Sequence, residues 1–344
     1  MNTVFRLFSL VLLASLPKGY AMDNLKLSSG YNIPSVGLGT SSIKPYDLEN
    51  AIINALENGY KHIDTAFTYH NEEAIGKVLK KWFAKGGARE NLFITSKLPS
   101  QGNRPESVEK YLKQSLKDLG LDYVDMYLIH TPFGLKEGVN NSPKEVNGIE
   151  IFENVNHNAL WKEMEKQVKN GYAKSIGLSN FNQSQIDNVY KNAEIKPSNL
   201  QVEIHAYLPQ KQLRQFCKKH NIVVTAYAPL GSHNSRTYLH KSTGKDLPAL
   251  IDLPIIKDLA QKYKKSPSQI LLRHTVQDDL VVIPKSSNSD RQKLNIDLFD
   301  FKLTAEDVKK IDNLDKGEKG RVFDFLKFYK GLENNPQYPF VEQS

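Results

Sequence analysis

The sequence predicts an α/β protein, a (β/α)8 TIM barrel with an N-terminal β-hairpin and long loops at the C-terminal face. Three observations predict this class: apolar runs alternate with amphipathic stretches, eight such runs occur, and no glycine-rich G-x-G-x-x-G turn follows the first. A doubly wound sheet is the main rival, but Gly37-Leu38-Gly39-Thr40 does not satisfy its phosphate-binding pattern. The 344 residues allow two domains, yet barrels of this size fold as one. We therefore expect a single domain over residues 22–344.

The elements follow from local pattern. Two extended pieces at residues 25–27 and 31–33 flank Ser28-Ser29-Gly30, which is typical of a hairpin turn. The eight expected strands are residues 36–39, 62–66, 92–96, 126–130, 175–178, 200–204, 223–227 and 281–284. The expected helices are residues 47–58, 71–85, 104–119, 158–169, 183–192, 210–220, 255–264 and 268–276. Three longer irregular stretches, at 133–155, 231–254 and 317–344, should lie at the C-terminal face, where barrels carry their active sites.

The composition limits the kinds of molecule that the protein is expected to bind. Lysine and arginine exceed aspartate and glutamate by 46 − 38 = +8, but they are spread along the chain without a long basic block. This pattern indicates a solvated basic surface or a phosphate-bearing small ligand, and it argues against nucleic acid. Cys217 is the single cysteine, which excludes a disulfide scaffold and a structural cysteine–zinc site. We expect no metal.

Residues 1–21 are typical of a signal peptide. Arg6 precedes a ten-residue apolar run at 7–16, and Gly19 and Ala21 are small residues of the kind that a signal peptidase reads. The run is too short to span a membrane, and a strand or buried helix of the fold is the alternative. We expect a protein that is secreted or held in the endoplasmic reticulum lumen; translation from Met22 would give a cytoplasmic form.

Two glycosylation sequons begin at Asn140 and Asn182. Such sequons are common by chance, and the sequence does not decide whether either is used.

Four polar residues fall at the expected carboxyl ends of strands: Asp64, Tyr69, Lys97 and His130. Each alone has an ordinary explanation, as a helix cap, a surface residue or a core histidine. Together they predict a proton-transfer device, because a lysine ammonium lowers a tyrosine pKa from about 10 and a carboxylate holds that lysine in place. A histidine beside them can orient a carbonyl oxygen.

Five stretches carry a family resemblance: residues 62–72 (HIDTAFTYHNE), 94–97 (ITSK), 127–130 (YLIH), 175–181 (SIGLSNF) and 283–286 (IPKS). They resemble, in the right order, the motifs of the aldo-keto reductase superfamily, and the resemblance covers about residues 25–340. It implies a monomeric barrel and NADPH-dependent reduction of a small-molecule carbonyl substrate, with no metal. By the same resemblance Tyr69 is the general acid, Lys97 lowers its pKa, Asp64 pairs with Lys97, and His130 orients the carbonyl.

The resemblance also implies a cofactor site. Ser179, Asn180 and Gln201 match residues that hold the nicotinamide carboxamide, and Tyr227 matches the ring stacked on the nicotinamide. Leu230 and Ser232 are expected along the pyrophosphate. The 2′-phosphate is expected at Lys285, Ser286 and Arg291, and the adenine at Asn295. The charge of Lys285 and the planar donors of Arg291 suit a phosphate dianion, so NADP should be preferred over NAD. Alternatively, these two side chains only cap a helix and face water.

The substrate end departs from aldose-reductase-like members, which have tryptophan where this chain has Ser41 and Thr131. The expected pocket lining is Phe67, Thr68, Thr131, Phe133 and Trp161. The run at 130–133, the Arg104-Pro105 pair and the tail at 324–340 resemble insect members of the family, which include a secreted 3-dehydroecdysone reductase. An ecdysteroid ketone is therefore one candidate substrate. The alternative function is a cofactor-binding regulatory module with little turnover, and the complete set of four catalytic-type residues favours an enzyme.

Overall fold

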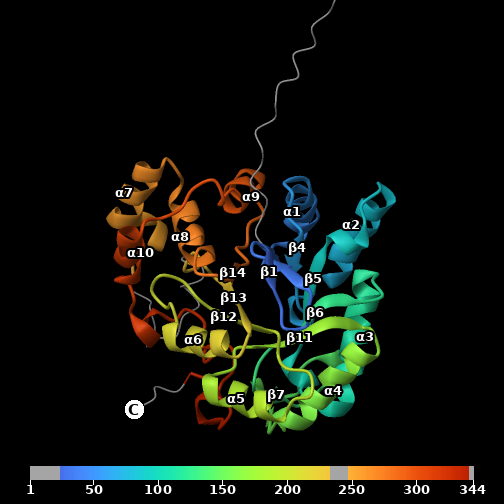
Figure 1. Cartoon of the computed structure of the whole chain (residues 1–344). Coiled ribbons are helices and arrows are strands. Elements are labelled where there is room, and N and C mark those ends of the chain that lie inside the picture. Colours follow the sequence, from blue (N-terminus) through green and yellow to red (C-terminus); the bar gives the residue numbers. More distant parts are fainter. Residues whose placement is uncertain (1–23, 233–246, 341–344) are drawn as a thin grey trace, which may run out of the picture.

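Eight parallel strands form the centre of the molecule in the computed structural model, which describes residues 24–232 and 247–340 (Figure 1). The strands are β3 (Leu38–Gly39), β4 (His62–Asp64), β5 (Phe93–Leu98), β6 (Val124–Ile129), β11 (Ala173–Ser179), β12 (Asn199–Glu203), β13 (Val223–Tyr227) and β14 (Val281–Val282). They pair in this order, and a parallel bridge between Val36 and Val282 joins the first strand to the last. The predicted eight-stranded barrel is confirmed. The expected signal peptide lies outside the described residues.

Helices surround these strands on the outside (Figure 1). They are α1 (Pro45–Glu57), α2 (Glu72–Ala84), α3 (Val108–Leu119), α4 (His157–Lys169), α5 (Gln183–Asn192), α6 (Lys211–Lys219), α7 (Pro254–Tyr263), α8 (Pro267–Val276), α9 (Ser289–Ile296) and α10 (Ala305–Asp312). Several begin at a side-chain cap; α8 starts with a capping box in which Ser266 and Gln269 bond each other's backbone N–H groups. The helix expected from residue 104 begins later, after a 3-10 turn at Pro105–Ser107.

Helices α9 and α10 are not among the predicted elements. Each has eight residues and buries only two of them, Gln292 and Asn295 in α9 and Asp307 and Ile311 in α10. Such short and mostly polar segments lack the apolar repeat that reveals a longer helix.

The predicted N-terminal hairpin covers the amino end of the barrel. Strands β1 (Asn24–Lys26) and β2 (Asn32–Pro34) pair antiparallel around Gly30, which has a positive φ of 91°. Leu27, next to β1, and Ile33, within β2, pack into one apolar cluster with Phe93 of β5. The hairpin thus closes one end of the barrel, and the carboxyl ends of the strands are left to carry the site.

Two of the long loops lie at that carboxyl end. The stretch expected to be irregular at 133–155 in fact contains two short antiparallel ladders, β7 (Gly134–Leu135) with β10 (Phe152–Glu153) and β8 (Glu145–Val146) with β9 (Ile149–Glu150). The C-terminal tail, described to residue 340, has only short 3-10 turns at Gly317–Gly320 and Leu332–Asn334. Within the described ranges, no helix has the length and apolar character needed to cross a bilayer.

Candidate active site

A buried lysine organises the carboxyl end of the barrel. Lys97, near the end of β5, is fully buried, and its ammonium donates hydrogen bonds to Asp64 Oδ1 at 2.6 Å, to the Thr65 carbonyl oxygen at 2.8 Å and to the Tyr69 hydroxyl at 3.3 Å. An ammonium has three N–H groups, so all three are used. Because Lys97 donates to the Tyr69 oxygen, the phenolic proton remains available to another acceptor.

Tyr69 reaches this position through a single turn of 3-10 helix, Phe67–Tyr69, that follows β4. With three residues per turn, consecutive side chains point about 120° apart. The turn ends at His70, which has a positive φ of 52°. Asn71 then holds the segment, because its amide donates to the Thr40 carbonyl oxygen and accepts from the Thr65 hydroxyl. The chain therefore presents Tyr69 from a segment fixed at both ends.

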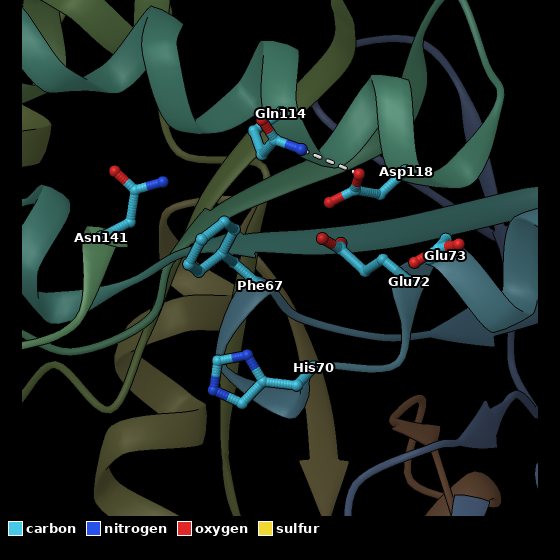
Figure 2. Close-up of a pocket in the computed structure, with 7 residues that line it drawn as sticks. All are labelled: Phe67, His70, Glu72, Glu73, Gln114, Asp118 and Asn141. Carbon is cyan, nitrogen blue, oxygen red and sulfur yellow. Dashed lines mark hydrogen bonds between the residues drawn. The ribbon is translucent and has the colours of Figure 1, made fainter. Parts of the chain in front are cut away.

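The ring of Phe67 packs on α3, and no contact among the described residues supports the prediction that it lines the substrate pocket. Its ring lies edge-on to Tyr111 of α3, with centroids 4.9 Å apart. Phe67 borders a cavity of about 370 Å³ together with Glu72 of α2 and Gln114 of α3. Figure 2 shows these side chains. The 3-10 turn explains the difference, because it sends Phe67 and Tyr69 in different directions.

Burial dominates the proton affinities here. It raises the pKa of Tyr69 above its ordinary value of 10, although the Lys97 charge acts in the opposite direction. The expectation that Lys97 brings this pKa down holds for the direction of that one interaction, but desolvation outweighs it. Burial alone would also lower the pKa of Lys97, yet the adjacent Asp64 and Tyr69 leave it raised. For His130, burial and then the Lys97 charge lower the pKa to about 3, so its imidazole is neutral.

Three further strands connect to this group. Gln201 on β12 donates to Asp64 Oδ2 at 2.7 Å, so both oxygens of that carboxylate are held. Asn180, which follows β11 and has a positive φ of 63°, donates to the His130 carbonyl oxygen at 2.8 Å. Tyr227 at the end of β13 donates to Asn180 Oδ1 at 2.9 Å. Ser179 Oγ accepts from the same Asn180 amide. The structure therefore brings together the predicted nicotinamide-contacting residues and the four strand-end residues.

The predicted adenosine end is different in character. Lys285 and Arg291 are exposed and form no ion pair with any described residue. They flank the start of α9, where Ser286 Oγ accepts from the Asn288 backbone N–H. Asn295 is buried on the same helix. Two unneutralised cations beside a helix start favour an anion with the charge of a 2′-phosphate. Leu230 and Ser232 lie between this end and Tyr227 in the sequence and are half-buried.

Aromatic side chains gather around Phe133, close to the end of β6. Its ring contacts Phe152 of β10 and, from the tail, Phe325 and Tyr329, with centroids 5.3 to 6.3 Å apart. Thr131 is buried beside it, with its hydroxyl bonded to Ser100 Oγ at 2.7 Å. Phe152, Phe325 and Tyr329 are not among the predicted lining residues. The many aromatic residues of the tail are the sequence feature that could have indicated the two tail residues.

Trp161 does not belong to this aromatic group, and the structure does not support its predicted place in the substrate pocket. It lies on the buried face of α4 in the core between helix and sheet, and its indole N–H donates to the Ile195 carbonyl oxygen at 2.9 Å. A large aromatic on an amphipathic helix packs inward for the same reason as its apolar neighbours Leu160 and Met164.

One buried carboxylate beside the site escapes sequence reasoning. Glu203 at the end of β12 is fully buried and accepts hydrogen bonds from the backbone N–H groups of Val322 and Phe323 at 2.7 and 2.8 Å. Burial would raise its pKa, but the hydrogen bond and charge of His205, the Arg321 charge and the Phe323 N–H lower it overall. The bonds place Phe323 edge-on to Tyr227, with centroids 5.8 Å apart. Glu203 thus ties the tail to the site.

Comparison with known proteins agrees with this geometry. The model of the aldo/keto reductase family matches residues 35–316. The chain belongs to the aldo/keto reductase family. It is 45% identical over 296 residues to the chicken (Gallus gallus) protein named aldo-keto reductase family 1 member A1, covering 86% of this chain and 89% of the relative.

Two further comparisons extend over more of this aldo-keto reductase. A macaque (Macaca fascicularis) protein named aldo-keto reductase family 1 member C4 is 40% identical over 328 residues, which is 93% of this chain and 98% of the relative. The solved structure of the aldose reductase from Schistosoma japonicum superposes with a TM-score of 0.84 at 40% identity, covering 94% of this chain and all of that one. Aldo-keto reductases of this kind are NADPH-dependent, so the chain is an NADP-dependent oxidoreductase acting on carbonyl compounds.

Proposed function

We propose that the enzyme reduces an aldehyde or ketone to an alcohol with Tyr69 as the general acid. The observation that carries this proposal is the hydrogen bond from Lys97 to the Tyr69 hydroxyl, since Lys97 is itself held by Asp64. The bound NADPH would supply a hydride to the carbonyl carbon. As the carbonyl oxygen gains negative charge, Tyr69 gives up its phenolic proton to it, and the Lys97 ammonium 3.3 Å away stabilises the phenolate that forms.

His130 and Asp64 have supporting roles in this proposal. His130 is neutral, so it can donate one N–H to the carbonyl oxygen without adding a second cation beside Lys97. Asp64 balances the Lys97 charge, and Gln201 holds the second oxygen of that carboxylate. The side-chain oxygen of Gln201, Oε1, is then left to accept from a nicotinamide carboxamide.

We assign the cofactor contacts in order from the nicotinamide to the adenine. Ser179, Asn180 and Gln201 would hold the carboxamide, and Tyr227 would stack on the nicotinamide ring. Leu230 and Ser232 would lie along the pyrophosphate. Lys285, Ser286 and Arg291 would bind the 2′-phosphate, and Asn295 the adenine. The charges of Lys285 and Arg291, which no described residue pairs, support the preference for NADP over NAD.

The aromatic group around Phe133 supports a bulky, apolar carbonyl substrate rather than a sugar. Phe133, Phe325 and Tyr329 offer ring faces and edges, and Thr131 leaves more room than a tryptophan would at that position. A steroid ketone such as 3-dehydroecdysone fits this description and is the finer form of the proposal.

The test is NADPH oxidation by the full chain with four carbonyl compounds: an aromatic aldehyde, a sugar aldehyde, a steroid ketone and 3-dehydroecdysone. Turnover that is lost in Tyr69→Phe supports the mechanism, and an active Tyr69→Phe enzyme overturns it. A preference for the sugar aldehyde overturns the substrate assignment. NADPH binding without turnover on any of the four would favour the regulatory module instead.

We further propose that the enzyme acts as a monomer and is exported through residues 1–21. The sequence pattern of those residues is the support for export. Amino-terminal sequencing of the protein from secretory cells tests it: a start at Met22 in the medium supports export, and an intact Met1 or an exclusively cytoplasmic protein contradicts it. Sedimentation gives the oligomeric state.

A further inference from the structure

We propose that Thr68 is a positioning residue that sets the tautomer of His130, so that the imidazole presents an N–H to the substrate carbonyl. The inference rests on the proposed function, in which His130 donates to the carbonyl oxygen. It concerns a side chain one residue before the general acid, expected until now only as pocket lining. The supporting observation is a contact between the Thr68 hydroxyl and His130 Nδ1, 3.4 Å apart.

The 3-10 turn directs Thr68 to His130. Phe67 packs on Tyr111, and Tyr69 bonds Lys97, so the middle residue of the turn points in a third direction. Thr68 is the one residue of this turn with a small hydroxyl side chain. Asn71 and Thr65 hold the segment through the hydrogen bonds described above. The approach of Thr68 to the imidazole is therefore set by the backbone.

Hydrogen bonding around the ring leaves one nitrogen for the substrate. Among the described residues, the Thr68 hydroxyl has no hydrogen-bond partner besides His130 Nδ1, and His130 Nε2 has none. Tyr69 meets the ring only edge-on, with centroids 5.7 Å apart. Nε2 is thus the nitrogen available to a carbonyl oxygen, and Nδ1 is the nitrogen that Thr68 controls.

The protonation state makes this control matter. A neutral imidazole carries a single proton, on one nitrogen or the other. When the Thr68 hydroxyl donates to Nδ1, the proton lies on Nε2, and the ring can donate to the carbonyl oxygen. In the opposite arrangement Nδ1 donates to Thr68, and Nε2 turns a lone pair toward an oxygen that is gaining negative charge. Only the first arrangement satisfies the hydroxyl, the imidazole and the substrate together.

The kinetic test compares three variants of the full chain. Thr68→Val keeps the branched shape and removes the hydroxyl, Thr68→Ser keeps the hydroxyl, and Thr275→Val makes the same isosteric change on α8, where the hydroxyl bonds only within the helix. We expect kcat to fall roughly three- to tenfold in Thr68→Val, the size of one lost neutral hydrogen bond, with the KM for NADPH unchanged. Thr68→Ser should recover most of that loss, and Thr275→Val should match the wild type. Equal kcat in Thr68→Val and the wild type would overturn the inference.

A spectroscopic readout is independent of turnover. Nitrogen-15 shifts of labelled histidines distinguish the two neutral tautomers, and loss of a signal in His130→Gln assigns His130 among the nine histidines. With NADP⁺ bound, the wild type and Thr68→Ser should show the proton on Nε2, and Thr68→Val a mixture of tautomers. An unchanged tautomer in Thr68→Val refutes the role of Thr68. If instead no carbonyl is reduced by the wild type, the proposed function fails while the tautomer result still stands.

Discussion

The two ends of the expected cofactor line use charge in opposite ways. At the nicotinamide end, Asp64 and Lys97 are buried and joined by a 2.6 Å ion pair, with every remaining polar atom of the pair held by a neighbour. At the adenosine end, Lys285 and Arg291 are exposed and unpaired within the described residues. A buried charge needs a partner inside the protein, whereas an exposed charge is solvated by water until a ligand binds. The first end is therefore built by folding and the second is completed by binding.

The largest effect should come from Tyr69→Phe, which removes the proton donor and keeps the ring. We expect kcat to fall roughly 100- to 10,000-fold, the usual contribution of a positioned general acid, while the Kd for NADPH changes little. Steady-state kinetics and quenching of NADPH fluorescence measure the two quantities. Tyr46→Phe is the matched control, because Tyr46 is 71% exposed. A large loss of NADPH binding in Tyr69→Phe would contradict the prediction, because it would show that Tyr69 contributes to cofactor binding.

Lys97→Met tests whether the buried pair is part of the fold as well as the site. It leaves the Asp64 carboxylate buried without its cation, so the free energy of unfolding should fall by about 3–5 kcal/mol. Lys285→Met changes an exposed lysine that has no ion-pair partner in the described ranges, and it should alter the free energy of unfolding by less than about 0.5 kcal/mol. Urea unfolding of both variants gives the comparison. Equal stability losses would show that burial does not separate the two ends.

A third buried acidic or basic group extends the comparison, because no cation among the described residues is bonded to Glu72. Within the part of the chain that the structure describes, its carboxylate accepts from the Ser96 and Ser115 hydroxyls alone, and burial raises its pKa from an ordinary 4.5 to about 7. The folded state therefore binds a proton more tightly than the unfolded state, so Glu72 makes the protein less stable as pH rises from about 4.5 to 7.

The matched variant is Glu72→Gln, which keeps the shape and removes the ionisation. Its free energy of unfolding relative to the wild type should improve by at most about 3 kcal/mol between pH 4.5 and pH 8, since each pKa unit corresponds to about 1.4 kcal/mol. Urea unfolding across this pH range measures the difference. A difference that does not depend on pH would mean that Glu72 titrates near its ordinary value in the folded protein.

Cofactor selectivity tests the exposed end directly. We expect Lys285→Met and Arg291→Met each to raise the Kd for NADPH about tenfold, the size of one charge-assisted hydrogen bond. The Kd for NADH should barely change, because NADH lacks the 2′-phosphate. Fluorescence titration with both nucleotides gives the ratio. Equal losses for NADPH and NADH would place these two residues outside the 2′-phosphate site.

The smallest effect concerns the two glycosylation sequons. One asparagine is exposed, like the adenosine end, and the other is held by neighbours in the fold, like the nicotinamide end. Asn140 is exposed, whereas Asn182 caps α5 and its amide donates to the Pro339 carbonyl oxygen. If the protein enters the secretory pathway, a glycan should be found on Asn140 and not on Asn182. Mass spectrometry after glycosidase treatment reads both sites, and Asn140→Gln should leave turnover unchanged. Glycan on Asn182 alone would contradict the prediction.

Sequence reasoning reached those parts of the molecule that are encoded locally. The eight strands follow from short apolar runs, and Asp64 and Lys97 stand at strand ends, where the barrel brings them together. The two lining predictions that the structure does not support depend on where a side chain points. Phe67 lies on a single 3-10 turn, and Trp161 lies on the buried face of α4. Glu203 was missed because its partners, Val322 and Phe323, lie about 120 residues later in the chain. Contacts of that range leave no local pattern.

The link between Glu203 and the tail also sets an order of events during protein synthesis. The barrel strands and all four strand-end residues precede residue 300, so they can assemble while the last segment is still inside the ribosome. Until Val322 and Phe323 emerge, the Glu203 carboxylate lacks two of its donors and Tyr227 lacks its neighbouring ring. The nascent chain therefore contains Asp64, Tyr69, Lys97 and His130 first and gains the contact between Phe323 and Tyr227 last.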